Sequence, residues 1–153
     1  MSAGTGNIGD RVLIAAEGWV GTPYRHQGAA KGVGCDCLGL VRGLWRELYG
    51  TEPEPPGPYA PDWAERSGED RLMRAALRHF GPALSADEMR PGDLLLFRWR
   101  VDCAAKHAGI LCGPDHFIHA YEQAAVVRSP LVPAWRRRIA AVFRFPAEAR
   151  GIP

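Results

Sequence analysis

The first half of the chain carries apolar residues at helical spacing. Residues 7–20 and residues 37–49 each place apolar side chains on one face with a period of about 3.6, which predicts two amphipathic helices. The first is expected to end at Gly21-Thr22-Pro23 and the second at Gly50, because these residue types break helices. Asp36, directly before the second helix, is expected to be its N-cap residue.

The segment around these helices is expected to be less regular. A glycine-rich loop is predicted at residues 28–34. Five prolines within residues 51–61 predict an irregular surface loop. Residues 62–80 then predict one helix, or two short ones, whose inward positions are Leu72, Ala76, Leu77 and Phe80.

After Met89 the apolar period changes from that of a helix to that of a strand. Short apolar runs bounded by Gly, Pro or Asp predict one antiparallel sheet with strands at residues 94–99, 108–112, 116–121, 125–128 and 139–145. Gly113-Pro114-Asp115 is expected to turn a hairpin between the second and third strands. Helices followed by strands are typical of the α+β class. We therefore expect a single domain over residues 1–153, with N-terminal helices packed on a C-terminal antiparallel sheet of about five strands.

The composition narrows the class of protein. Hydrophobic residues make up 46% and charged residues 24% of the chain, which is typical of a globular domain and excludes a fibrous or wholly disordered protein. The net charge is only +2, and no RNA-binding aromatic motif or phosphate-binding loop occurs, so no nucleic-acid partner is expected. No apolar run is long enough to span a membrane, and the N-terminal segment does not resemble a signal peptide. We expect synthesis in the cytoplasm without membrane insertion.

The cysteines raise two possibilities, a metal site and a reactive thiol. A zinc site would combine Cys103 and Cys112 with the histidines around them, but these spacings are irregular and no metal is expected. Cys37 is the stronger candidate, because it follows the glycine-rich loop and begins a predicted helix. Backbone N–H groups and the positive end of the helix dipole favour a thiolate there, so a lowered thiol pKa is expected.

Two histidines are candidate partners of this thiol. A reactive thiol needs an imidazole to take its proton and a third group to orient that imidazole. His107 begins one predicted strand and His119 ends the next, so pairing across the turn places them nearly opposite each other and within hydrogen-bonding reach. The alternative is a pair of structural sheet histidines, and the thiol at a helix start favours the catalytic interpretation.

Five motifs occur in order along the chain, namely GTPY at residues 21–24, GCDCLGLV at 34–41, PGDL at 91–94, HAGI at 107–110 and IHA at 118–120. Together they resemble the NlpC/P60 cysteine peptidases, and among these the phage-type cell-wall peptidases encoded in tail modules of phages and gene transfer agents. The resemblance covers residues 8–145. It implies a papain-like NlpC/P60 fold, no metal or organic cofactor, and cleavage of peptidoglycan stem peptides, with preference for the bond between D-γ-glutamate and the diamino acid.

The resemblance also implies a role for each matching residue. Cys37 would be the nucleophile, His107 the general base and then the general acid, and His119 the residue that orients His107. Tyr24 would place its hydroxyl near the oxyanion or the substrate, and the backbone N–H of Cys37 would donate to the oxyanion. Asp36 would hold a substrate amine or cap the helix, and its residue type favours the cap.

Some positions depart from the family pattern. Leu38 stands where the family usually has serine, so we expect substrate contacts to differ there. His26 lies close to Tyr24 in sequence and is a rival for a role in the site. The long segment between residues 50 and 89 is expected to form a lid, a groove wall or a docking surface.

Other residues are assigned structural roles. Cys103 and Cys112 are expected to be buried small residues. Core or half-buried packing is expected for Trp19, Trp45 and Trp63. His79 and His116 are expected at the surface, and the arginines at 136–138 in a solvated turn that could face an anionic cell wall. Cys35 is interpreted as a small loop residue, with a reversible Cys35–Cys37 disulfide as the alternative.

A peptidoglycan hydrolase made in the cytoplasm needs a route to the cell wall. A phage-like tail tip provides one, so we expect tail-tip or baseplate proteins as partners and the periplasmic cell wall as the site of action. Two rival interpretations stay open. The chain could be a structural tail-tip component that keeps the fold without using the thiol, or an amidase or acyltransferase with the same triad, which Leu38 leaves open.

Overall fold

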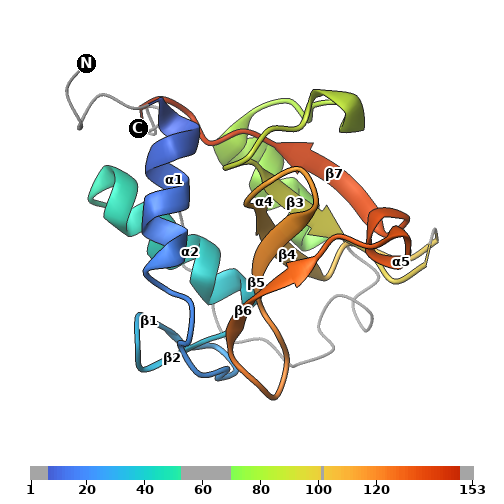
Figure 1. The fold of residues 1–153 in the computed structure, drawn as a ribbon. Coiled ribbons are helices and arrows are strands. Elements are labelled where there is room, and N and C mark those ends of the chain that lie inside the picture. Colours follow the sequence, from blue (N-terminus) through green and yellow to red (C-terminus); the bar gives the residue numbers. More distant parts are fainter. Residues whose placement is uncertain (1–6, 53–69, 101, 149–153) are drawn as a thin grey trace.

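The computed structural model describes residues 7–52, 70–100 and 102–148 (Figure 1). The helices are α1 (Ile8–Glu17), α2 (Cys37–Tyr49), α4 (Arg71–Phe80) and the short α5 (Pro133–Arg136). A small sheet consists of β1 (Ala29–Ala30) and β2 (Gly34–Cys35). A five-stranded antiparallel sheet consists of β3 (Leu94–Phe97), β4 (His107–Leu111), β5 (His116–Ala120), β6 (Val126–Pro130) and β7 (Ile139–Phe143).

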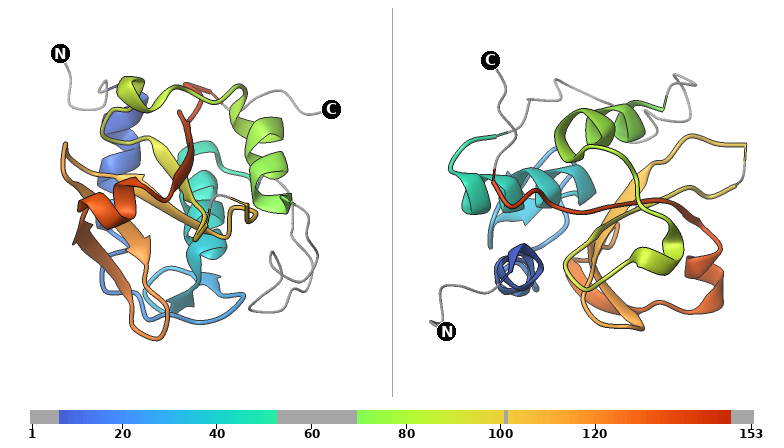
Figure 2. Two further views of the ribbon diagram at one scale, coloured as in Figure 1. Left: turned by 90° about the vertical axis from the view of Figure 1, so that its right-hand side faces the viewer. Right: turned by 90° about the horizontal axis from the view of Figure 1, so that it is seen from above.

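The strands of the larger sheet lie in the order β6-β5-β4-β3-β7. Strands β3 to β6 follow one another as a meander, and β7 returns to pair with the other edge of β3. The helices α1 and α2 precede the sheet in the chain and pack together on one of its faces (Figures 1 and 2). This arrangement confirms the predicted α+β class, and each of the five predicted strands is present within two residues of its expected bounds.

The sheet separates two apolar cores. The larger core joins α1, α2 and α4 to one face of the sheet, and Trp19 and Trp45 are almost fully buried in it, which confirms their predicted positions. The smaller core, which contains Phe97 and Phe117, packs against Trp135 of α5. Successive side chains of a strand point to opposite faces, so β3, β4 and β5 each contribute apolar side chains to both cores.

Helix α2 has the bounds that its sequence predicts, because both of its ends are specified locally. The Asp36 carboxylate accepts a hydrogen bond from the N–H of Gly39 at 2.8 Å. Gly50 follows the last turn with φ of 83°, a left-handed conformation that glycine adopts readily. A Cβ added at Gly39 would lie 1.7 Å from the carbonyl oxygen of Gly28. The first turn of α2 therefore lies directly on neighbouring backbone, which fixes the position of Cys37.

The glycine-rich stretch at residues 28–34, predicted as a loop, forms the hairpin of β1 and β2. Strand β2 also binds the chain that precedes the hairpin, where the N–H of Cys35 donates to the carbonyl oxygen of Pro23 at 3.0 Å. On its other side, this earlier segment binds the chain before β6, because the N–H of Tyr24 donates to the carbonyl oxygen of Ala124 at 3.0 Å. Backbone hydrogen bonds thus connect the start of α2, through Tyr24, to β6.

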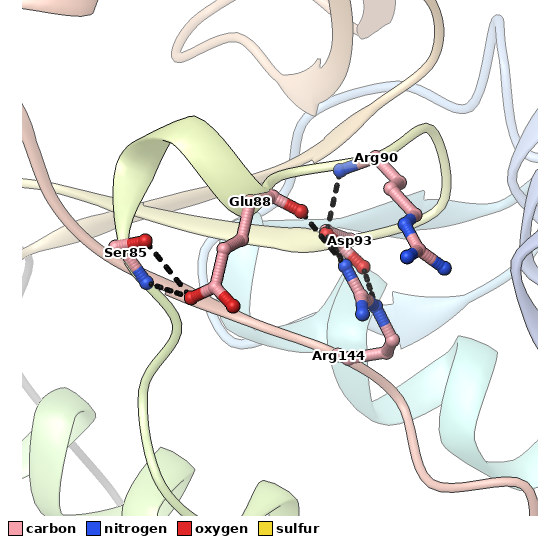
Figure 3. Close-up of polar contacts among 5 residues, drawn as sticks. All are labelled: Ser85, Glu88, Arg90, Asp93 and Arg144. Carbon is pink, nitrogen blue, oxygen red and sulfur yellow. Dashed lines mark hydrogen bonds and ion pairs between the residues drawn. The ribbon is translucent and has the colours of Figure 1, made fainter.

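The turn Pro91-Gly92-Asp93 connects the start of β3 to the chain after β7. The buried carboxylate of Asp93 accepts hydrogen bonds from Nε and Nη2 of Arg144, both at 3.0 Å, and from the N–H of Arg90 at 2.8 Å (Figure 3). Arg144 also donates to the carbonyl oxygen of Glu88 at 3.0 Å, and the Glu88 carboxylate accepts from the N–H of Ser85 at 2.9 Å. This network holds β3 beside β7.

Within α4, the prediction of which residues face inward is partly wrong. Leu77 is 46% exposed, whereas His79 is buried with its ring 5.9 Å from that of Trp45. The buried face of α4 repeats through Leu72 and Ala76 to His79, so the histidine occupies the inward position expected for Leu77. Burial of an imidazole here is stabilised by its edge-on contact with the indole.

Other expectations have mixed outcomes. Cys103 and Cys112, expected to be buried, are partly exposed, and His116 is exposed as predicted. Most of the predicted proline-rich loop, residues 62–69 of the predicted third helix, and Trp63 lie outside the described residues. Within the described part of the chain, no helix combines the length and the apolar character that crossing a membrane requires.

Candidate active site

Cys37 is the first residue of α2 and lies against strand β4. Its S–H donates to the carbonyl oxygen of Lys106 at an S···O distance of 3.9 Å. The backbone N–H of Ala108 also interacts with this sulfur, in the sense that lowers the thiol pKa. The thiol therefore contacts the backbone on both sides of His107, which brings the candidate nucleophile and the candidate base to the same place.

Three side chains on neighbouring strands form a hydrogen-bonded row. Nε2 of His107 on β4 lies 2.8 Å from Nδ1 of His119 on β5. Nε2 of His119 lies 2.8 Å from Oγ of Ser129 on β6. His119 is fully buried, and the other two residues are partly exposed. The structure thus brings together the two predicted histidines and adds Ser129, which no sequence motif marks.

The two histidines are not direct cross-strand partners, contrary to the expectation from the sequence. Strands β4 and β5 pair in a register in which Ile110 lies opposite Ile118, so Gly109 lies opposite His119. A Cβ added at Gly109 would be 3.2 Å from the Cβ of His119. His107 therefore reaches His119 diagonally, across space that the missing side chain of Gly109 leaves open.

The surroundings keep the thiol and both imidazoles neutral near pH 7. Burial, followed by the nearby charge of Asp36, raises the pKa of Cys37 to about 12. Burial, with smaller contributions from His119 and Lys106, lowers the pKa of His107 to about 3, and burial lowers the pKa of His119 to about 4. The expected lowering of the thiol pKa is therefore wrong, because desolvation and a neighbouring carboxylate outweigh the helix dipole.

Aromatic rings pack against the histidine pair. The ring of Trp99 stacks on that of His107, with centroids 6.0 Å apart and an interplanar angle of 22°. Trp135 contacts the rings of His107 and His119 at centroid distances of 5.8 and 5.4 Å, and Phe117 lies 4.3 Å from His119. These rings exclude water from the imidazoles, which explains their lowered pKa values. They come from three separate segments, so no local pattern identifies them as parts of the site.

Tyr24 and Asp36 both lie near Cys37. Tyr24 is partly buried, and its pKa is raised by burial and then by the nearby charges of Cys37 and Asp36. Asp36 is almost fully buried, and its carboxylate accepts hydrogen bonds from the N–H groups of Gly39 and Gln27, both at 2.8 Å. Asp36 is therefore the helix cap that its residue type predicts.

The remaining candidates are His26, Leu38 and Cys35. His26 is exposed, and its Nδ1 lies 3.9 Å from the Asp36 carboxylate. Leu38 is partly buried and packs against the larger core. Cys35 is fully buried, and all four cysteines are free thiols. Among residues 7–52, 70–100 and 102–148, no group of three or more His, Cys, Asp or Glu side chains is placed to hold a metal ion.

A comparison with protein families identifies the chain. Residues 21–144 match the model of the NlpC/P60 family. The chain belongs to the NlpC/P60 family. The matched region contains all the candidate site residues described above, from Tyr24 to Ser129.

Two NlpC/P60 relatives illustrate the similarity in sequence. The chain is 29% identical over 133 residues to the Murein DD-endopeptidase MepS/Murein LD-carboxypeptidase of Escherichia coli (strain K12). The aligned region covers 86% of this chain and 60% of that protein. It is 28% identical over 135 residues to the Gamma-DL-glutamyl hydrolase of Bacillus subtilis (strain 168). This alignment covers 88% of this chain and 29% of that protein. The chain thus spans less than two thirds of the length of these relatives.

Solved NlpC/P60 structures share the fold. The NlpC/p60 domain of peptidoglycan hydrolase SagA superposes with a TM-score of 0.62 at 21% identity, covering 90% of this chain and 98% of that domain. NlpC1 from Trichomonas vaginalis gives a TM-score of 0.67 at 19% identity, covering 94% of this chain and 46% of that protein. These structures confirm the predicted fold. The prediction of an enzyme is confirmed at the level of the family, since NlpC/P60 proteins are cysteine peptidases.

Proposed function

We propose that this NlpC/P60 chain is a thiol endopeptidase that cuts peptidoglycan stem peptides between D-γ-glutamate and the following diamino acid. Cys37 is the nucleophile, His107 is the general base and then the general acid, and His119 orients His107. The observation that carries the proposal is the 2.8 Å hydrogen bond between the two imidazoles, on a strand whose backbone the Cys37 thiol contacts on both sides of His107. A purely structural histidine pair would not require a thiol at this position.

The hydrogen-bonded row allows two sets of proton positions, and the proposed reaction uses one of them. When Oγ of Ser129 accepts from Nε2–H of His119, Nδ1 of His119 carries a lone pair and accepts from Nε2–H of His107. His107 then keeps a lone pair on Nδ1, which is the base that the reaction needs. Since burial holds the pKa of His107 far below 7, at about 3, this base is available at neutral pH.

The proposed reaction proceeds through a thioester. Sγ of Cys37 attacks the amide carbonyl carbon while its proton passes to His107. The backbone N–H of Cys37, which has no partner within α2 because it lies in the first turn, donates to the oxyanion. His107 gives the proton to the departing amine as the C–N bond breaks. A water molecule then loses a proton to His107 and attacks the thioester, and that proton returns to the Cys37 sulfur as the acid is released.

The names of the relatives support the substrate class and leave the bond to be tested. The Escherichia coli relative is named for DD-endopeptidase and LD-carboxypeptidase activities, and the Bacillus subtilis relative for hydrolysis at γ-DL-glutamyl groups. The buried carboxylate of Asp36 beside Cys37 supports the glutamyl bond for this chain. An anion next to the nucleophile favours an acyl half with a positively charged N-terminal amine, which L-alanyl-γ-D-glutamate carries.

Two defined substrates test the bond. A stem tetrapeptide (L-alanine, γ-D-glutamate, diaminopimelate, D-alanine) and its dimer cross-linked through D-alanine are incubated with the purified protein, and the products are identified by mass spectrometry. We expect L-alanyl-γ-D-glutamate from both substrates. Conversion of the dimer to monomer without any dipeptide would contradict the proposed bond, and no cleavage of either would contradict the endopeptidase activity. Transfer of the acyl group to an added amine instead of water would favour an acyltransferase.

We also propose that the enzyme reaches the periplasmic cell wall on a phage-like tail tip. The resemblance of its motifs to phage-type cell-wall peptidases supports this route. The protein is expected to co-purify with tail or baseplate proteins, and particles that carry the Cys37→Ala variant are expected to assemble but to lose entry through the wall. Recovery only as free protein would contradict delivery on a particle. Equal entry by particles with either protein would favour a structural tail-tip role.

A further inference from the structure

A groove rich in arginine opens beside the candidate active site. It has a volume of about 720 Å³, and Arg98, Arg100, Arg137 and Arg138 line it around Trp99. No carboxylate stands among its lining residues within the described part of the chain. Guanidinium groups gathered in one groove create a positive potential that attracts anions. The groove is therefore suited to a negatively charged ligand.

Two segments that are distant in sequence build this groove. Arg98 and Arg100 follow β3, whereas Arg137 and Arg138 precede β7, which pairs with β3 in the sheet. The N–H of Arg98 donates to the carbonyl oxygen of Arg138 at 2.8 Å, which extends this pairing. Figure 1 shows the start of β7, with α5 before it, at the same end of the sheet as the chain that leaves β3. The central sheet thus holds both pairs of arginines in place.

Trp99 connects the groove to the imidazole of His107. The two rings stack with centroids 6.0 Å apart. The guanidinium of Arg138 lies 5.3 Å from the centroid of the Trp99 ring, and Nζ of Lys106 lies 5.7 Å from it. In the proposed mechanism His107 protonates the departing amine, so the half of the peptide that leaves must lie on the His107 side of the nucleophile. The groove adjoins that side.

We propose that the arginine groove binds carboxylates of the leaving half of the peptide. This inference rests on the proposed function and adds a specificity for the substrate. In a diaminopimelate-type stem, the leaving half carries a carboxylate on the diamino acid side chain and another at its C-terminus, and guanidinium groups bind carboxylates through paired hydrogen bonds. Arg98 lies 3.9 Å from the carboxylate of Asp70, so the exposed Arg137 and Arg138 are the residues assigned to the ligand.

Matched substrates test this specificity. Two stem tetrapeptides differ only in whether the carboxylates of the leaving half are free or amidated. We expect the wild type to prefer the free acid by roughly tenfold in kcat/KM, and the R137Q/R138Q variant to lose most of this preference. The R74Q/R78Q variant, which removes the same charge from exposed positions of α4 outside the groove, is expected to keep it. The absence of a preference in the wild type would overturn the proposal.

A binding measurement on the Cys37→Ala protein, which lacks the proposed nucleophile, tests this inference independently of the proposed function. The dipeptide diaminopimelyl-D-alanine is titrated by calorimetry into this protein with and without R137Q/R138Q, and melting temperatures verify that both proteins are folded. We expect the affinity to fall roughly tenfold in the groove variant. No binding, or equal binding by both proteins, would overturn the groove even if the wild type cleaves stem peptides. Tighter arginine-dependent binding of a phosphodiester polymer than of the dipeptide would overturn the carboxylate assignment.

Discussion

The imidazoles of His107 and His119 are joined by a 2.8 Å hydrogen bond although the residue opposite His119 on β4 is Gly109. The contact runs diagonally from one strand to the next, and the row continues with the same slant to Ser129 on β6. A diagonal pair on a sheet is normally too far apart for short side chains. The missing side chain of Gly109 and the reach of two imidazole rings allow it here.

Gly109→Ala is expected to disturb the histidine pair. The added Cβ would lie 2.9 Å from Cδ2 of Phe117 and 3.2 Å from the Cβ of His119, so both side chains must shift. Because proton transfer depends steeply on orientation, we expect kcat to fall by roughly tenfold or more. Single-turnover kinetics measure the effect, and Gly113→Ala, where an added Cβ meets nothing within 4 Å, is the matched control. A folded G109A protein with unchanged kcat would contradict this dependence.

Ser129→Ala is expected to lower kcat with little effect on KM. In the proposed set of proton positions, the hydroxyl of Ser129 accepts from Nε2–H of His119, which leaves Nδ1 of His119 to accept from His107. Loss of one such hydrogen bond costs about 1 kcal/mol, or roughly fivefold in rate. Nitrogen NMR of the histidine rings is expected to show a mixture of His119 tautomers in S129A, and Ser129→Thr, which keeps a hydroxyl, is expected to restore the wild-type pattern. A single unchanged tautomer in S129A would contradict the positioning role.

Asp36→Asn is expected to make the Cys37 thiol more acidic. The Asp36 charge is one of the causes that raise the pKa of Cys37 to about 12, so its removal shifts that pKa downward. The rate of alkylation by iodoacetamide, followed at Cys37 by peptide mass mapping over a series of pH values, measures this shift. The variant is also expected to be less stable by about 1–3 kcal/mol, because one of two capped backbone N–H groups loses its acceptor. An unchanged pH profile of alkylation would contradict the assigned cause.

The shifted pKa values of His107, His119 and Cys37 predict how the free energy of unfolding depends on pH. Histidines of the unfolded chain bind protons near pH 6.5, whereas the pKa values of His107 and His119 in the folded protein are about 3 and about 4. Between these values the unfolded state binds more protons, so stability is lost as the pH drops below 6.5. For Cys37 the pKa is raised from 9.0 to about 12, so the native state retains a proton that the unfolded state releases, and stability declines as the pH rises above 9.0.

Urea unfolding at a series of pH values tests this linkage. We expect maximum stability between the two limits, and a shallower decline in acid for His107→Gln, which lacks one of the two imidazoles with a lowered pKa. The exposed His116→Gln is the control and is expected to follow the wild type. An acid decline of equal slope in H107Q and the wild type would show that His107 does not contribute to it.

The parts of the fold that could be predicted from sequence are those where the apolar periodicity and the residues at the ends of an element indicate the same structure. Helix α2 has its expected bounds because Asp36 caps one end and Gly50 adopts a left-handed conformation at the other. The five strands follow from alternating or short apolar runs bounded by turn residues. Cys37 and the two histidines could be singled out because they occur in motifs at the ends of these elements.

The rest depends on packing between distant segments. Ser129 and Trp135 join the histidines from β6 and α5, and nothing in their local sequence indicates a role. The register of β4 with β5, which places Gly109 opposite His119, is set by pairing of whole strands and differs by two residues from the one expected. The direction of the thiol pKa shift was predicted wrongly because the desolvation of Cys37 arises from tertiary burial.

Digestion of purified diaminopimelate-type peptidoglycan by the wild type and by Cys37→Ala tests the central proposal most directly. Soluble fragments are identified by mass spectrometry, and equal melting temperatures verify that the two proteins are folded. We expect fragments that end after γ-D-glutamate from the wild type and none from C37A, because the thioester cannot form without the thiol. Release of the same fragments by both proteins would contradict the assignment of Cys37 as the nucleophile.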